Sequence, residues 1–152
     1  MSAFGYNQDA GTVVVEASFN SRSDGQTFHR TVELSNGSSS RLAMFDDANQ
    51  SNEYIRYFVR DDTASNVFGA ANLSGSDQTE VNLAIAYAAN DMAVYGGNGQ
   101  SATGSSGQMG ADVTTRNIGK EGNDTSFLNG HIKSIQYYPR RLTDAQLQEL
   151  TS

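Results

Sequence analysis

Arginine and aromatic side chains alternate along one short segment of this 152-residue chain, residues 53–60. Every second residue of the segment is apolar and would face a core; these residues are Ile55, Tyr57 and Val59. The residues between them should form the outer face of a strand, because two arginines cannot be buried unpaired. These residues are Tyr54, Arg56, Phe58 and Arg60. Aromatic rings stack on the C–H faces of sugars, and arginine forks donate to hydroxyl or acidic groups. These residue types favour a carbohydrate-binding surface.

In a second segment, residues 79–95, the side chains expected to face outward are unusually small, so this face is flat. They include Ala84, Ala86 and Ala93. If it neighbours the arginine segment in one sheet, small residues form a floor with aromatic and arginine edges. The predicted ligand-binding residues are then Tyr54, Arg56, Phe58, Arg60, Asn82 and Tyr95. The alternative is a contact surface, covered by a neighbouring subunit or by a loop of the same chain.

Oxygen-bearing side chains gather just before the arginine segment and could bind a cation. Calcium takes roughly six to eight oxygen ligands, and the candidates here are Asp46, Asp47, Asn49 and Glu53. Their spacing is not that of an EF-hand. The alternative is that these residues terminate strands and keep the surface soluble, so calcium is a cofactor that the sequence suggests without requiring it.

Residues for catalysis are not arranged in a recognisable pattern. A glycosidase needs two carboxylates facing one another about 5–9 Å apart across a groove. No segment of the sequence has a pattern that indicates such a pair. The two histidines, His29 and His131, lie on different predicted strands, where we expect both to face solvent. The chain has no cysteine. We therefore predict a protein that is not an enzyme.

Charge and composition exclude further classes. Seventeen acidic residues against ten Lys and Arg leave a formal charge of -7, so nucleic acids and anionic membranes are not expected partners. The longest apolar runs fall well short of the roughly 20 residues that span a bilayer. Only 18% of the residues are charged and proline occurs once. Together with many Gly, Ser, Thr and Asn residues, this composition favours an all-β fold.

Apolar alternation predicts strands separated by turn signals at the spacing of a sandwich or barrel. In the strand over 27–34, Phe28, Val32 and Leu34 are expected inward and His29, Thr31 and Glu33 outward, with Arg30 interrupting the pattern. Residues 96–110 predict a long loop or a short strand between two loops. The last strand loses its alternation near Ser134, which predicts a β-bulge. The expected strands cover residues 12–19, 27–34, 41–45, 53–60, 79–89, 91–96, 113–118 and 130–138.

One short helix is expected at the C-terminus. Thr143 followed by Gln146 three residues later forms a capping box, and Leu142 with Leu147 supplies a hydrophobic staple. Leu147 and Leu150 would seat this helix on the strands.

Residues 128–150, LNGHIKSIQYYPRRLTDAQLQEL, resemble the closing strand and helix of a concanavalin-A-like, laminin-G-like jelly-roll domain. More narrowly, they resemble the version at the C-terminus of bacteriophage tail-fibre and other virion proteins. Residues 5–8 before the first strand and residues 87–95 resemble further pieces of that domain. The stretch over 41–76 matches by strand pattern alone.

The resemblance implies a single all-β domain over residues 1–152, a two-sheet antiparallel jelly-roll sandwich of the lectin and glucanase type with one short C-terminal α-helix. It further implies a non-catalytic, lectin-like module of a phage virion or tail protein, virion-borne or extracellular, that binds a polysaccharide or other glycan. It transfers no functional residue, because family members differ in where they bind sugar or calcium. The alternative is a structural domain of a homo-oligomeric virion fibre that binds no sugar itself.

Overall fold

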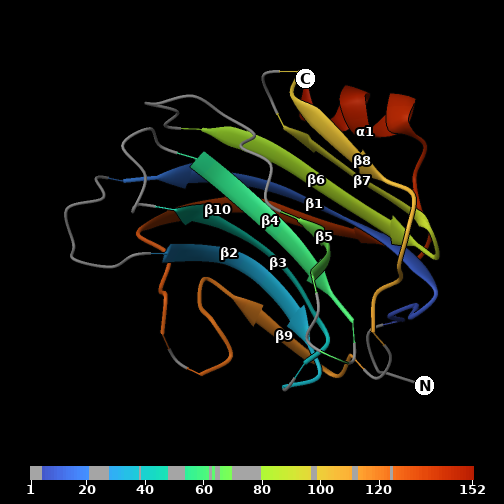
Figure 1. Ribbon diagram of the computed structural model, residues 1–152. Coiled ribbons are helices and arrows are strands. Elements are labelled where there is room, and N and C mark those ends of the chain that lie inside the picture. The colour runs from blue at the N-terminus through green and yellow to red at the C-terminus, as the bar shows by residue number, and fades with distance from the viewer. Residues whose placement is uncertain are drawn as a thin grey trace.

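The computed structural model describes residues 5–20, 28–37, 39–47, 54–61, 63, 66–69, 80–96, 99–110, 113–123 and 125–152. These residues form two five-stranded antiparallel sheets that pack face to face (Figure 1). Sheet A has the order β10 (Gly130–Tyr138), β1 (Ala10–Phe19), β6 (Val81–Ala88), β7 (Asp91–Gly96), β8 (Ser101–Gly104). Sheet B has the order β5 (Asn66–Gly69), β4 (Tyr54–Arg60), β3 (Arg41–Asp47), β2 (Phe28–Ser35), β9 (Thr115–Ile118). The predicted jelly-roll sandwich is confirmed.

The core lies between the sheets and is built from alternate residues of the long strands. As predicted, the inward positions of β1 begin at Val13, those of β4 at Ile55 and those of β6 at Val81. Segment 96–110 contains β8, the short strand between loops. The β6–β7 hairpin turns at Ala89 and Asn90, and Asn90 adopts a left-handed conformation with φ of 56°, which asparagine tolerates well.

β-Bulges in β10 and β2 change which side chains face outward. In β10, Ser134 pairs with Glu16 and Ile132 pairs with Ala17, so Lys133 is the extra residue; the predicted slip near Ser134 is confirmed. The second bulge, between Arg30 and Val32 in β2, was not foreseen.

The bulge in β2 reverses the faces of the residues before it. His29 is buried and its Nδ1 lies 3.1 Å from Asp46 Oδ2, while Phe28 lies at the outer face against Phe45. The expectations of an outward His29 and an inward Phe28 are wrong, because one inserted residue shifts the side-chain period by one. His131 is solvent-exposed, as expected.

Helix α1 (Asp144–Thr151) covers the outer face of sheet A over β6 and β7 (Figure 1). The predicted capping box is present: the Gln146 amide N–H donates to Thr143 Oγ1, and the Thr143 amide donates to Gln146 Oε1. Leu142 and Leu147 pack on the small residues of the sheet, which are Val14, Ala84, Ala86 and Ala93. The flat face is therefore covered by the same chain. Within the described residues, no helix has the length and apolar character needed to cross a membrane.

Replacing Leu147 with Ala should destabilise the protein by about 2–5 kcal/mol, because it leaves a cavity beneath the helix. Leu147 is completely buried in the contact between α1 and sheet A. Urea unfolding of the wild type and the variant measures the difference. The matched control is Gln148→Ala on the exposed side of α1, expected to stay within about 0.5 kcal/mol. Equal losses in both variants would contradict this packing.

Candidate functional site

The predicted ligand-binding residues divide between the two sheets. Arg56, Phe58 and Arg60 lie on β4 in sheet B, whereas Asn82 and Tyr95 lie on β6 and β7 in sheet A. Tyr54 pairs with Asp47 at the start of β4, and its side chain is outside the described residues. The expected adjacency of the two segments is wrong, because β4 pairs with β3 and β5 while β6 pairs with β1 and β7.

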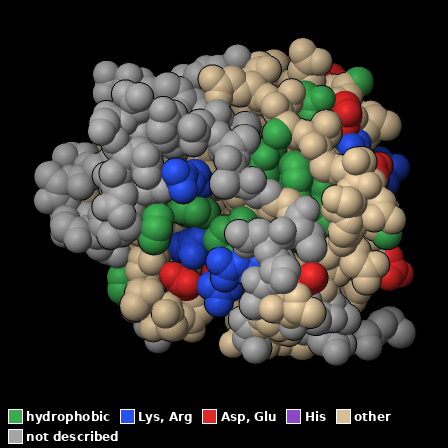
Figure 2. Space-filling view, viewed as in Figure 1, with side chains coloured by type: hydrophobic (Ala, Val, Ile, Leu, Met, Phe, Trp, Pro, Cys, Tyr) green, Lys and Arg blue, Asp and Glu red, His purple; other side chains and the backbone are tan. Residues whose placement is uncertain are grey.

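A pocket of about 310 Å³ opens on the outer face of sheet B, and we call it the arginine pocket. Figure 2 shows cationic side chains gathered there beside hydrophobic and acidic ones. It is lined by Phe28, Arg30, Arg41, Phe45, Arg56, Tyr57, Phe58, Arg60 and Glu121. The three outward residues predicted on β4 thus meet residues of β2, β3 and the loop after β9.

Phenylalanine rings form the floor of the arginine pocket. Phe45 stands edge-on to Phe28 at 5.3 Å between ring centroids and to Phe58 at 5.8 Å. The Arg30 guanidinium carbon lies 4.5 Å from the centroid of Phe45 and 5.2 Å from that of Phe58. Arg60 lies 4.7 Å from the Phe58 centroid. These cation–π contacts attract the guanidinium groups of Arg30 and Arg60 to the rings of the floor.

A fully buried carboxylate, Glu33, anchors the arginines from below. Its Oε2 lies 3.6 Å from Arg41 Nη1 and 4.0 Å from Arg30 Nε. Its Oε1 accepts hydrogen bonds of 3.2 Å from the Asn117 amide and from the Gly122 backbone N–H. A buried charge is tolerated only when it is paired and hydrogen-bonded in this way.

A second carboxylate, Glu121, closes one side of the pocket. Its Oε1 accepts from Arg41 Nη1 at 2.7 Å and lies 3.4 Å from Arg30 Nη2, and its Oε2 accepts from the Ser126 hydroxyl at 3.1 Å. Burial alone would raise the pKa of Glu121, but Arg30, Ser126 and Arg41 together outweigh burial and lower it. Glu121 is therefore held ionised within this network.

The charge balance of the pocket is the opposite of the chain's. Within the part of the chain that the structure describes, four arginines face two carboxylates here, in a protein with a net charge of -7. Arg30 is only 5% exposed, and among the described residues its Nη1 has no hydrogen-bond partner. A buried donor without an acceptor costs about 1–3 kcal/mol. Burial also lowers the pKa of Arg30, opposed by Glu121 and Glu33. An anionic group entering the pocket would balance the excess positive charge.

Of the four predicted calcium ligands, the structure describes the side chain of Asp46 alone. Asp46 lies on β3 and is fully buried, with its Oδ2 3.1 Å from His29 Nδ1, so it is not available at the surface as a calcium ligand. The Asp47 side chain, Asn49 and Glu53 lie outside the described residues. Among the residues that are described, no three His, Asp or Glu side chains cluster as a metal site would require.

Sequence reasoning identified three of the nine described lining residues, Arg56, Phe58 and Arg60, and expected Tyr57 to face the core. The other lining residues that it missed are Phe28, Arg30, Arg41, Phe45 and Glu121, together with the anchor Glu33. Arg30 did carry a signal, since it interrupts the alternation of β2, and that interruption marks the bulge that turns it outward. Glu121 carried none, because it reaches the pocket from a loop far away in sequence.

These features define a class: a two-sheet jelly-roll sandwich with a helix over one outer face and a cationic, aromatic pocket on the other. No protein-family model matches the sequence, and no curated protein matches it. Solved structures do share the fold. The CBM40 of the Ruminococcus gnavus IT-sialidase bound to α2,3-sialyllactose matches with a TM-score of 0.76 and 14% identity, over 95% of this chain and 83% of that one.

Two other similar structures come from different settings. The leech intramolecular trans-sialidase, complexed with 2,7-anhydro-Neu5Ac, matches with a TM-score of 0.74 and 14% identity over 95% of this chain and 23% of its own. A SAP-like pentraxin from Limulus polyphemus matches at 0.66 and 15%, over 97% of this chain and 73% of its own. At such identities the likeness establishes the fold.

Neutralising Glu121 by Glu121→Gln should destabilise the protein at pH 7. A carboxyl whose folded pKa is lowered stabilises the folded state above its unfolded pKa, about 4.3, and loses that contribution as the pH falls through the folded pKa. The stability difference from the wild type should therefore narrow as the pH falls from about 5 to about 3. Denaturant unfolding across this range measures it. Glu149→Gln, at an exposed position on α1, is the matched control; a Glu121 difference independent of pH would refute the ionised network.

Proposed function

We propose that this protein is a non-catalytic carbohydrate-binding module and that it holds an acidic sugar of the sialic acid type in the arginine pocket. The single observation that carries the proposal is the arginine pocket itself: four arginines on a phenylalanine floor in a strongly acidic chain. Arginine forks suit a carboxylate, and aromatic rings suit the C–H face of a pyranose.

The pocket has the size and the chemistry for one sugar residue. Its volume of about 310 Å³ falls at the lower end of small-molecule sites, roughly 300–1,000 Å³. Arg56 and Arg60 lie on either side of Phe58 along β4, so a carboxylate paired with either arginine would place the sugar ring beside the phenylalanine floor. Similar folds from the R. gnavus sialidase have been solved with α2,3- and α2,6-sialyllactose, which supports an acidic sugar as the ligand.

The carboxylates at the pocket support binding without catalysis. Glu33 is fully buried and Glu121 is bonded to Arg41, so both are engaged by arginines. A glycosidase needs one carboxylic acid to protonate the leaving oxygen and a second carboxylate opposite it. Two carboxylates paired with arginines on one side of a pocket do not supply that arrangement.

The setting of the module is a further part of the proposal. The resemblance of residues 128–150 to the end of phage tail-fibre proteins supports a place on a virion, with extracellular glycan as the partner. The rival role, a fibre domain whose outer face packs against other copies, was based partly on the flat face of sheet A. That face is covered by α1 of the same chain, which weakens the rival.

Substituting Arg56→Ala should weaken binding of 3′-sialyllactose by about tenfold or more, because it removes a charge-assisted donor. Lactose, which lacks the carboxylate, should bind neither protein measurably. Isothermal titration calorimetry gives both affinities, and size-exclusion chromatography shows whether the assembly state changes. The matched control is Arg140→Ala, an exposed arginine outside the pocket. Loss of assembly with binding retained would favour the structural role instead.

Calcium dependence needs its own measurement. A glycan array probed in added calcium and in chelator should give the same bound glycans in both arms if the arginine pocket alone holds the ligand. Loss of binding in chelator would direct attention to the predicted ligands Asp47, Asn49 and Glu53. Absence of binding in both arms would contradict the proposal.

A further inference from the structure

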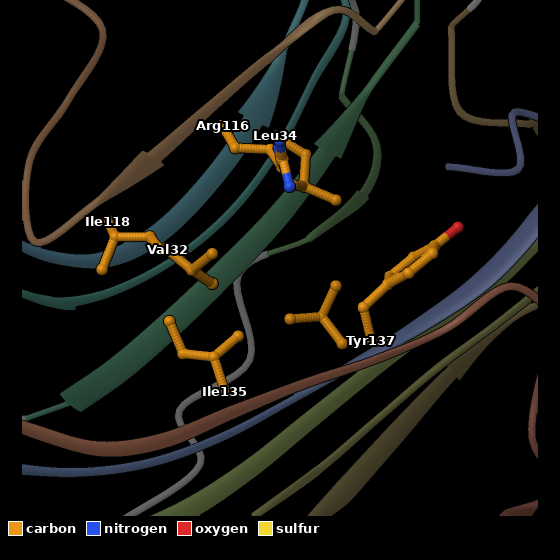
Figure 3. A pocket seen from close by; sticks show the side chains of 7 residues that line it. Val32, Leu34, Arg116, Ile118, Ile135 and Tyr137 are labelled. Carbon is orange, nitrogen blue, oxygen red and sulfur yellow. The ribbon is translucent and has the colours of Figure 1, made fainter. Parts of the chain in front are cut away.

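A second hollow of about 450 Å³ lies between the two sheets at one open edge of the sandwich, where β9 faces β10 (Figure 3). We call it the edge slot. Its floor is core surface, and its walls are the inward residues of the two edge strands. It is lined by Val13, Val32, Leu34, Arg116, Ile118, Ile135 and Tyr137.

The edge slot exists because the two edge strands do not close over the core. Ile118 lies on the inward face of sheet B, because it pairs with the core residue Val32. It is nevertheless 61% exposed. Ile135 and Tyr137 on the opposite strand are only partly buried. An inward isoleucine that stays this exposed leaves apolar surface available to a ligand, since burying it is worth about 25 cal/mol per Å².

Among the described residues, one charged side chain lines the slot. Arg116 pairs with Leu34, so it projects from the same inward face of sheet B as the core residues (Figure 3). The other described side chains that line the slot are aliphatic or tyrosine. An apolar slot with one cation at its wall is complementary to a molecule that is apolar along its length and anionic at one end.

We propose that the edge slot binds the acyl chain of an anionic amphiphile, a linear alkyl carboxylate, with the carboxylate beside Arg116. Packed sheets lie about 10 Å apart, so a gap between their edge strands favours a thin linear chain over a bulky ring system. Arg116 and Ile118 are two residues apart on one strand, about 7 Å. A chain whose carboxylate pairs with Arg116 therefore runs past Ile118 and Ile135.

The edge slot is separate from the arginine pocket. The slot lies between the sheets, whereas the pocket lies on the outer face of sheet B, and the residues that line them differ. The two proposals therefore stand independently. A variant that loses sugar binding, such as Arg56→Ala, should retain alkyl carboxylate binding.

Calorimetric titration of the whole chain with hexanoate, octanoate and decanoate tests the proposal. Affinity should rise about fourfold for each added CH₂ until the slot is filled. Arg116→Gln should weaken octanoate about tenfold and leave octan-1-ol unchanged, because the alcohol lacks the charge. Affinity independent of chain length, or no saturable binding of any of the three acids, would overturn the proposal.

A pair of exposed apolar residues supplies the matched control. Ile118→Asp places a negative charge at the slot and should abolish octanoate binding, whereas Phe127→Asp makes the same change at a 48% exposed residue that does not line it. Phe127→Asp should bind like the wild type. Thermal unfolding of both variants checks that they fold. Equal octanoate affinity in the two variants would refute the site, and Arg116→Gln remains decisive if Ile118→Asp does not fold.

Discussion

The buried carboxylate of Glu33 is the constraint on which the binding face of this protein depends. Four arginines of one face would repel one another, and Arg30 is itself almost fully buried. Glu33 lies within ion-pair distance of Arg30 and Arg41 and is itself held by Asn117 and the Gly122 backbone. Such a network preorganises the donors, so a ligand need not pay to order them. Removing one partner of this network would leave another charge buried without compensation, which is strongly destabilising.

The helix determines which face is left for a ligand. Small residues on sheet A allow Leu147 to approach closely, and α1 then covers that sheet. The outer face of sheet B instead carries arginines and phenylalanines, to which the loop after β9 contributes Glu121. One sandwich thus has a closed apolar face and an open cationic one, although the chain as a whole is acidic. Local charge, rather than net charge, governs what such a face attracts.

Much of the fold could be predicted because it follows from local patterns. Alternation gave the core faces of β1, β4 and β6, the parity slip near Ser134 marked a real bulge, and Thr143 with Gln146 marked the helix start. The site could be predicted only in part. Arg56, Phe58 and Arg60 lie on one strand, so their shared face follows from the alternation of that strand. Which strands become neighbours in a sheet does not follow from such a local pattern, and β4 pairs with β3 rather than with β6.

Direct observation of the arginines tests the central claim most sharply. Arginine Nε–Hε signals, assigned by NMR with single Arg→Lys variants, would be followed as 3′-sialyllactose is added. We predict saturable shifts at Arg30, Arg56 and Arg60 with lactose inert, and no shift at Arg140 or Arg141, which lie outside the arginine pocket. Shifts confined to arginines outside the pocket, or none at all, would contradict an acidic-sugar site on sheet B.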